Sequence, residues 1–193
     1  MNDLFSFLKE KEDIREGNII VPDLIYEQNF LSIEDADGLM DKIDNSEWSC
    51  ELSRRVQHYG FKYNYKSRYI DNTMKAIAIP DWLTGIGQKL VDDGFFKKNP
   101  DQVIVNEYKP GQGIAPHVDC VPCFGETVAS LSLLSPCIMQ LTSIENSKTV
   151  NIDLNPASVI IFSGDARYKW KHSIIARKND VINNISRPRQ RRV

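Results

Sequence analysis

The stretch VASLSLLSPCIMQLTSIENSKTVNIDLNPASVIIF, residues 128–162, contains four short β-rich runs separated by turn residues. Further runs lie on either side of it: VIVNEY at 103–108, WKHSII at 170–175 and RRV at the end of the chain. Strands at a spacing of about ten residues, with turns between them, indicate a sandwich or barrel rather than alternating βαβ units. Residues from about 101 to 193 are therefore expected to form a β core.

The first hundred residues predict helices and one early strand. IIVPDLIY at 19–26 is a short strand interrupted by Pro22, which suits the edge of a sheet. Ser32 followed by Asp35 is a capping-box-like start for a helix. The apolar face of that helix would contain Ile33, Ala36, Leu39, Met40 and Ile43. Apolar residues at helical spacing predict a second helix over about 81–93.

The composition is that of one ordinary globular domain: 193 residues, of which 41% are apolar and 26% charged. No apolar run approaches the roughly 20 residues that cross a bilayer, and the N-terminal MNDLFSFLKEKED mixes acidic residues into any signal peptide. A membrane or secreted location is therefore not expected. The four cysteines, Cys50, Cys120, Cys123 and Cys137, are too sparse for a disulfide framework. We expect reduced thiols in a cytoplasmic protein, or a nuclear one in a eukaryotic cell.

The net charge of −2 hides a strong asymmetry along the chain. Residues 1–51 carry 4 basic and 14 acidic residues, whereas residues 52–70 carry 5 basic and no acidic ones. Residues 166–193 carry 9 basic residues and 1 acidic residue. The segment 52–70 also contains five aromatic residues, a mixture that suits phosphate contact and base stacking. Two hairpins with solvated cationic faces are the alternative interpretation.

Two of the three histidines suggest a metal site. His117 and Asp119 are separated by one residue, so on an extended strand both side chains project from the same face. His172, in another β-rich run, is the candidate third ligand. Two histidines and one carboxylate form the facial triad of non-haem iron(II) oxygenases, which leaves coordination positions open for a chelating oxoacid and dioxygen.

The CVPC sequence at 120–123 has three possible interpretations. With His117 it could contribute to a zinc site, but a structural zinc needs four ligands and the chain has no second CxxC or HxxxH pair. A thioredoxin-like redox role would need a βαβ context, which the surrounding β-rich runs do not provide. Two thiols in a loop near the metal site are the simpler interpretation.

The segments VNEYKPGQGIAPHVDCVPCFGETVASLSLLSP (105–136) and FSGDARYKWKHSI (162–174) resemble the AlkB family of iron(II)- and 2-oxoglutarate-dependent dioxygenases. The family pattern Asn-x-Tyr-x-x-Gly, His-x-Asp, Ser-Leu-Ser and Ser-Gly-acid-x-Arg is met in order, and the resemblance runs from RRVQHYGF at 54–61 to the end of the chain. It implies a double-stranded β-helix, or jelly roll, with N-terminal helices against one sheet. It also implies that His117, Asp119 and His172 are the catalytic iron ligands.

The resemblance assigns further roles position by position. Asn106 and Tyr108 match the family's pair that contacts the cosubstrate 2-oxoglutarate, and Arg192 matches an arginine that binds its distal carboxylate. Arg167 falls where a guanidinium would hold the Asp119 carboxylate. A second family arginine would fall after Val193, so either the sequence is a truncated version or the last strand is shorter than in the family, with loss of one cosubstrate contact.

The basic aromatic segment lies where the family has a nucleotide-recognition lid over the iron. By this resemblance, Arg54 and Arg55 would contact phosphate and an aromatic residue near Tyr59 would stack on the target base. The alternation in YGFKYNYKSRY places four aromatic rings on one strand face, namely Tyr59, Phe61, Tyr63 and Tyr65. Packing of that face into the core is the alternative. The flanking aromatics Phe124 and Trp170 are both expected to lie in the core.

The resemblance implies a single dioxygenase domain over 1–193, with helices and lid in about 1–100 and the jelly roll in about 101–193. The expected reaction is oxidative demethylation of N-alkylated bases in DNA or RNA. Iron(II) would be the bound metal, 2-oxoglutarate and O2 would be consumed, and formaldehyde and succinate would be released. The substrate would be a single-stranded or flipped base, and the protein a monomer. The RYxWxH and HVDxxxxFG contexts also look similar to the tRNA-modifying branch, so hydroxylation of a wobble uridine is an alternative. A nucleic-acid-binding scaffold with weakened catalysis is a third possibility.

Overall fold

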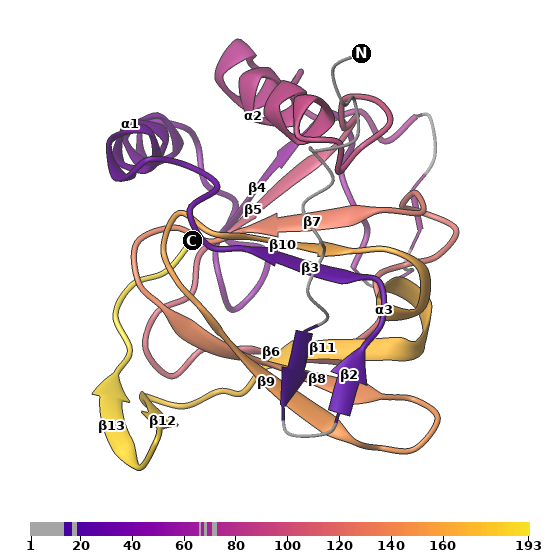
Figure 1. Cartoon of the computed structure of the whole chain (residues 1–193). Helices are drawn as coiled ribbons and strands as arrows, with labels where there is room; N and C mark the ends of the chain where they lie inside the picture. The colour runs from indigo at the N-terminus through magenta and orange to yellow at the C-terminus, as the bar shows by residue number, and fades with distance from the viewer. Residues whose placement is uncertain (1–13, 17–18, 66, 68, 71–72) are drawn as a thin grey trace, which may run out of the picture.

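The computed structural model describes residues 14–16, 19–65, 67, 69–70 and 73–193, and two antiparallel sheets form its centre (Figure 1). The first sheet has the strand order β3 (Leu24–Glu27), β10 (Val159–Phe162) and β7 (Val128–Leu131). The second has the order β6 (Ile114–His117), β11 (Trp170–Ile174), β8 (Cys137–Ser143) and β9 (Thr149–Leu154). The mainly β prediction for residues 101–193 is confirmed.

Strand β10 is buried on both faces, which explains its continuous apolar sequence VIIF. Ile160 and Phe162 pack into the cluster between the two sheets, together with Leu141 and other residues of the second sheet. Val159 and Ile161 project to the opposite side and join a second cluster with the helices. Alternate residues of one strand thus serve two hydrophobic layers.

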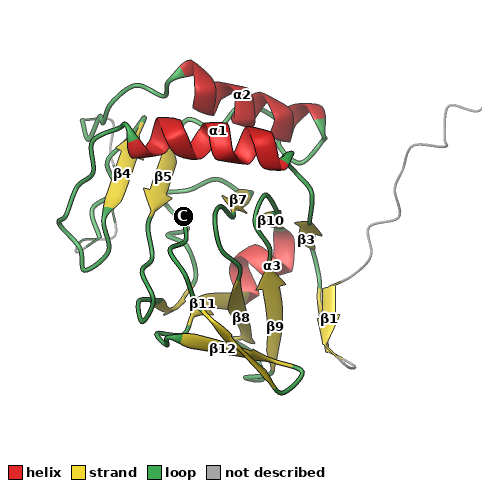
Figure 2. Cartoon of the chain, turned by 90° about the vertical axis from the view of Figure 1, so that its left-hand side faces the viewer, coloured by secondary structure: helices red, strands yellow, loops and turns green. Residues whose placement is uncertain are grey.

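Two helices cover the outer side of the first sheet (Figures 1 and 2). Helix α1 (Ile33–Asp44) begins as predicted, with the Ser32 hydroxyl accepting a hydrogen bond from the Asp35 backbone N–H at 3.0 Å. Its buried residues are Ala36, Leu39, Met40 and Ile43. Ile33 was expected on that face but is 64% exposed. It is the first residue of the helix, and the buried face begins one turn later, at Ala36. Helix α2 (Asp81–Asp92) agrees with the predicted range of about 81–93.

The N-terminal hundred residues supply more than helices and a lid. The predicted strand at 19–26 is divided at Pro22 into β2 (Ile19–Val21) and β3, and β3 is an edge strand of the first sheet. β1 (Ile14–Glu16) pairs with β2, and β4 (Val56–Tyr59) pairs with β5 (Val103–Asn106).

Of two further elements after residue 163, the short helix was not predicted, whereas a hairpin in the basic segment 166–193 was the alternative interpretation. The short helix α3 (Gly164–Lys169) occupies GDARYK, between β10 and β11. The hairpin of β12 (Asn179–Ile182) and β13 (Ile185–Pro188) turns at Asn183 and Asn184, both with positive φ, of 49° and 64°. Asparagine tolerates this conformation better than most residues, so the Asn-Asn pair was the available sequence signal. Over the described residues, no helix has the length and apolar character needed to cross a membrane.

Candidate metal and cosubstrate site

The three predicted metal ligands come from two adjacent strands of the second sheet and the loop that follows one of them. His117 ends β6, His172 lies on β11, and the two residues are direct partners in the antiparallel register. Asp119 lies two residues beyond the end of β6. Antiparallel pairing therefore places the two imidazoles side by side, and the chain after β6 adds the carboxylate.

The geometry of these three side chains fits one shared metal ion. Asp119 Oδ1 lies 3.7 Å from His117 Nε2 and 3.8 Å from His172 Nε2. Two atoms that share a first-row metal at bonds of about 2.1 Å lie at most about 4 Å apart, and both distances meet this limit. Among the described residues, this is the one group of three histidine, cysteine or acidic side chains close enough to hold an ion.

A hydrogen bond at one imidazole and burial at the other favour metal binding through Nε2. The Nδ1 of His117 lies 2.8 Å from the Ala115 carbonyl, which directs a proton to Nδ1 and leaves the Nε2 lone pair for a metal. Burial lowers the pKa of His172 to about 4, against the opposing charge of Asp119. His172 is therefore neutral at physiological pH and needs no deprotonation before it binds a metal.

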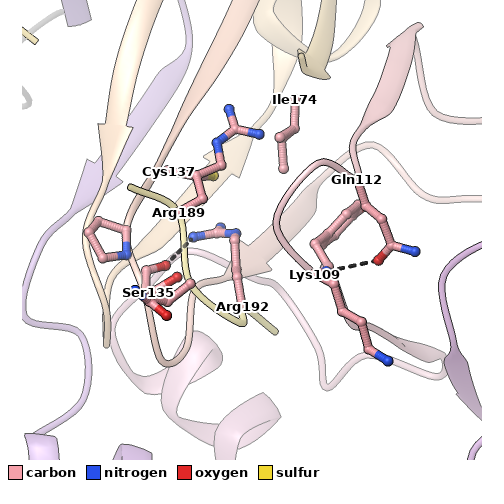
Figure 3. Close-up of a pocket in the computed structure, with 10 residues that line it drawn as sticks. Lys109, Gln112, Ser135, Cys137, Ile174, Arg189 and Arg192 are labelled. Carbon is pink, nitrogen blue, oxygen red and sulfur yellow. Dashed lines mark hydrogen bonds between the residues drawn. The ribbon is translucent and has the colours of Figure 1, made fainter. Parts of the chain in front are cut away.

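Of the three predicted cosubstrate residues, Tyr108 and Arg192 line one pocket, and Asn106 is not among its lining residues. Figure 3 shows Arg192 in this pocket. Their backbones pair, with the Tyr108 N–H donating to the Arg192 carbonyl at 2.8 Å and the Arg192 N–H donating back at 3.0 Å. Burial raises the pKa of the Tyr108 hydroxyl, and the charges of Arg54 and Arg192 oppose that shift. The hydroxyl therefore remains a hydrogen-bond donor. The pocket also contains Ile174, which lies two residues after His172 on β11.

Arg192 is a buried cation whose partners in the described chain are neutral. Its side chain is 5% exposed and donates to the Ser132 hydroxyl at 2.7 Å and to the Ser135 carbonyl at 3.3 Å. Arg189, which lines the same pocket, is instead paired bidentately with Asp180 at 2.8 and 2.9 Å. An unpaired buried charge is costly, so the environment of Arg192 fits an anionic ligand such as a carboxylate.

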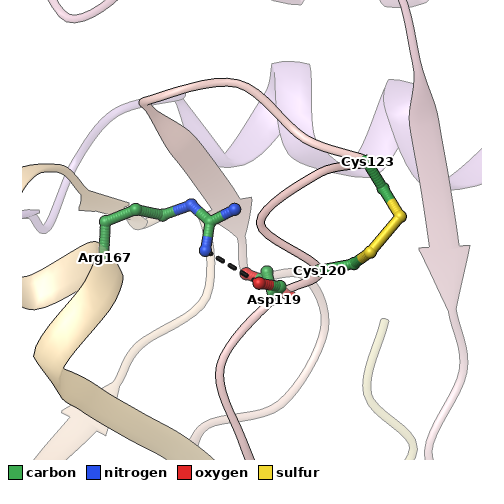
Figure 4. The surroundings of a disulfide bond; sticks show 4 residues. All are labelled: Asp119, Cys120, Cys123 and Arg167. Carbon is green, nitrogen blue, oxygen red and sulfur yellow. Dashed lines mark hydrogen bonds between the residues drawn. A yellow bond between two sulfur atoms is a disulfide. The ribbon is translucent and has the colours of Figure 1, made fainter. Parts of the chain in front are cut away.

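Arg167 contacts Asp119 in a different way from the one expected. It is 2% exposed, and its Nη1 donates to the backbone carbonyl of Asp119 at 3.0 Å rather than to the carboxylate (Figure 4). Its Nε donates to the Gly125 carbonyl at 3.4 Å. The prediction that Arg167 holds the carboxylate is thus corrected: the described contact fixes the backbone that carries the ligand.

The expectation of four reduced thiols is wrong for one pair. Cys120 and Cys123 form a disulfide immediately after Asp119 (Figure 4). Their spacing brings the two Cα atoms to 5.2 Å, within the range that a disulfide spans. Cys50 and Cys137 are free, the first exposed and the second buried. The pair therefore shapes the loop beside the metal ligands, and a zinc site built on these sulfurs is not supported.

Two of the three predicted nucleic-acid contacts are occupied elsewhere. Arg55 donates to the buried carboxylate of Glu107 at 2.6 and 2.7 Å and lies over the Trp48 ring, so a phosphate contact is not supported for it. Tyr59 is 4% exposed and packs edge-on against Trp82 in the helix-side core, which excludes base stacking. The core-packing alternative holds for this residue.

The aromatic face predicted for YGFKYNYKSRY does not continue past Gly60. Strand β4 ends at Tyr59, and Gly60 has a positive φ of 78° with no room for a side chain beside the Asp101 carbonyl. The chain turns there, so Tyr63 leaves the strand face of Tyr59.

A separate aromatic cluster follows that turn and includes a residue expected in the core. The Tyr63 ring lies 5.0 Å from the Tyr65 ring and 5.4 Å from the Phe124 ring, measured between centroids. Phe124 is half-buried and belongs to the disulfide loop after Asp119. Trp170, in contrast, packs in the core as predicted. The cluster of Tyr63, Tyr65 and Phe124 was missed because it joins segments 60 residues apart.

Arg54 turns toward the cosubstrate pair. Its Nε donates to the Asn106 side-chain carbonyl at 2.8 Å, and its guanidinium carbon lies 5.7 Å from the centroids of both Tyr65 and Tyr108. Its described hydrogen bond and ring contacts are thus to the cosubstrate pair and to Tyr65, not to a solvent-facing partner.

The basic segment 166–193 is partly neutralised within the fold. Most of its arginines pair with acidic side chains from other elements. The pairs are Arg187 with Asp153, Arg177 and Arg189 with Asp180, and Arg191 with Glu107 and Asp44. Ion pairs with acidic residues outside the segment therefore offset part of its positive charge.

Comparison with known proteins agrees with this site. A family model described as the 2OG-Fe(II) oxygenase superfamily matches residues 24–193. The tRNA (carboxymethyluridine(34)-5-O)-methyltransferase alkbh8 of Xenopus tropicalis is 38% identical over 83% of this chain and 26% of its own length. The alkylated DNA repair protein ALKBH8 homolog of Arabidopsis thaliana is 30% identical over 92% of this chain and 58% of its own length. The chain thus spans less than two thirds of either relative.

A solved structure shows the same fold. The structure of OsALKBH1 aligns with a TM-score of 0.63 at 17% identity, covering 89% of this chain and 94% of that one. At this identity the similarity concerns the fold alone. The jelly-roll prediction is confirmed.

Proposed function

Because this chain belongs to the 2OG-Fe(II) oxygenase superfamily, we propose that it oxidises an alkylated base in DNA or RNA. The observation that carries the proposal is the convergence of His117, Asp119 and His172, in a fold that also buries Arg192 without a described carboxylate partner. When bound, iron(II) with 2-oxoglutarate and O2 supplies an oxidant that hydroxylates a C–H bond, with succinate and carbon dioxide as products. Hydroxylation of an N-methyl group yields a product that releases formaldehyde.

The side chains of this protein would bind and orient the reactants. Arg192 would donate hydrogen bonds to the distal carboxylate of 2-oxoglutarate, and the Tyr108 hydroxyl would donate another to it. Tyr63 and Phe124 supply aromatic surface for a base, in place of the buried Tyr59. Arg167 and the disulfide hold the loop that carries Asp119.

Hydroxylation of a tRNA uridine is a second candidate. The similarity to a protein named as a carboxymethyluridine(34) tRNA methyltransferase favours it. Because the match covers 26% of that protein, its substrate is carried over here only as a proposal.

One aerobic experiment tests both candidates. The protein is incubated with iron(II), 2-oxoglutarate and a panel of methylated DNA and RNA oligonucleotides and modified tRNA. Formaldehyde release with a demethylated base supports demethylation, whereas a mass gain of one oxygen on uridine supports hydroxylation. Succinate should form with the wild type and not with His117→Ala. Failure of the wild type to form succinate with any substrate would contradict both candidates and leave a binding scaffold.

A further inference from the structure

Arg54 links the segment before β4 to the strand that carries the cosubstrate residues. Residues 106–108 alternate in direction: Glu107 faces Arg55 and Arg191, whereas Asn106 contacts Arg54. The same alternation separates Arg54 from Arg55. The two adjacent arginines therefore have different roles, one in an ion-pair network and one against the cosubstrate pair.

The contact with Arg54 fixes one orientation of the Asn106 amide. A guanidinium only donates hydrogen bonds. The 2.8 Å contact with Arg54 therefore requires the amide of Asn106 to present Oδ1 rather than Nδ2. The Nδ2 of Asn106 is then directed away from Arg54 and free to donate to a ligand. The guanidinium also lies 5.7 Å from the Tyr108 ring centroid, so it restrains the second cosubstrate residue as well.

We propose that Arg54 is a positioning residue for 2-oxoglutarate, acting through Asn106 and Tyr108 rather than by contact with a nucleic-acid phosphate. The proposal rests on the proposed function, because it assumes that 2-oxoglutarate occupies this pocket. The Tyr65 ring lies on the same guanidinium. Arg54 therefore joins the aromatic cluster with Tyr63 and Phe124 to the cosubstrate pocket.

The test is the dissociation constant of 2-oxoglutarate, measured by calorimetry without O2 on manganese(II)-loaded protein. Arg54→Met keeps the aliphatic length but removes the donor, and it should weaken binding about tenfold, as expected for one lost charged hydrogen bond. Arg54→Lys keeps charge and a donor and should recover part of the loss. Lys62→Ala removes a cation of the same segment that pairs with exposed Glu51, and it should leave the constant unchanged.

A double-mutant cycle shows whether Arg54 acts through Asn106. In an Asn106→Ala background, Arg54→Met should weaken 2-oxoglutarate binding much less than in the wild type. Equal losses in both backgrounds, or no loss in the wild-type background, would overturn the proposal. So would an unchanged 2-oxoglutarate constant with a reduced salt dependence of RNA binding, since that result marks a phosphate contact. A wild type that binds no 2-oxoglutarate contradicts the proposed function instead.

Discussion

His117 and His172 are direct register partners across β6 and β11, with ring centroids 4.3 Å apart. Strand register thus assembles the candidate metal site. A slip of one residue would turn His172 to the opposite face of the sheet, so the pairing of β11 with both β6 and β8 protects the site.

Removal of one triad imidazole should abolish tight metal binding. We expect His172→Ala to weaken manganese(II) binding by more than about 100-fold, beyond the loss caused by an outer partner of a metal ligand. Titration monitored by electron paramagnetic resonance measures the effect. His58→Ala, which removes the histidine outside the triad, is the control and should retain affinity. Equal affinity of wild type and His172→Ala would disprove the site.

Substitution of the two pocket arginines, Arg192 and Arg189, should have different effects on the free energy of unfolding. Arg192→Met removes a buried cation without a described carboxylate partner, so the cosubstrate-free protein should keep its stability or gain some. The same variant should lose 2-oxoglutarate affinity. Arg189→Met removes both hydrogen bonds from Arg189 to buried Asp180, which keeps Arg177 as a partner, and should destabilise the fold by about 1.5–3 kcal/mol. Urea denaturation checks both, and a destabilised Arg192→Met would argue against an anion site.

Glu107 should make stability depend on pH. Hydrogen bonding from Arg55 holds the pKa of Glu107 below its usual range, although burial acts in the opposite direction. A lowered folded pKa stabilises the ionised form, so the contribution is full above the unfolded pKa of about 4.3 and is lost as the pH falls through the folded value. Glu107→Gln should cost about 3–5 kcal/mol at neutral pH, because Glu107 is 2% exposed and Arg55 and Arg191 lose their shared partner.

The corresponding measurement is urea unfolding of both proteins at neutral pH and near pH 3. The difference in free energy of unfolding between wild type and Glu107→Gln should be smaller near pH 3 than at neutral pH. Glu126→Gln removes an exposed partner of Lys97 and should cost less than about 1 kcal/mol. If the difference in free energy of unfolding did not change with pH, ionisation of Glu107 would not be the source of the pH-dependent stability.

The four cysteines should differ in alkylation. Exposed Cys50 should react with iodoacetamide in the native, unreduced protein. Cys137 should resist, because its side chain is buried and burial raises the pKa of its thiol. Cys120 and Cys123 should react only after a dithiol reductant is added. Peptide mass spectrometry reads out each site, and labelling of Cys123 before reduction would contradict the disulfide.

Substitution of Tyr63 should affect nucleic-acid binding, whereas substitution of Tyr59 should affect the stability of the fold. Tyr63→Ala should weaken nucleic-acid binding, because stacking on one aromatic ring contributes about 1–3 kcal/mol per base. Tyr59→Ala should instead lower the melting temperature, because the side chain fills the helix-side core. Fluorescence anisotropy and thermal unfolding measure the two effects. Unchanged nucleic-acid affinity in Tyr63→Ala would remove this ring from the substrate surface.

The sequence by itself determined the strand-rich core and the start of α1 at Ser32, and it indicated the three candidate metal ligands. These features depend on local pattern: turn residues between apolar runs, a capping side chain, and a His-x-Asp pair. The division at Pro22 also followed from local chemistry, since proline removes a backbone donor.

Only the tertiary structure decided which side chains were free to act. Arg54 and Arg55 are adjacent in sequence, yet one contacts Asn106 and the other is neutralised by Glu107, because successive residues face opposite sides. Tyr59 entered the core and Tyr63 met Phe124 because the chain turns at Gly60. Charge and stacking depend on partners that are distant in sequence, and folding alone brings those partners together.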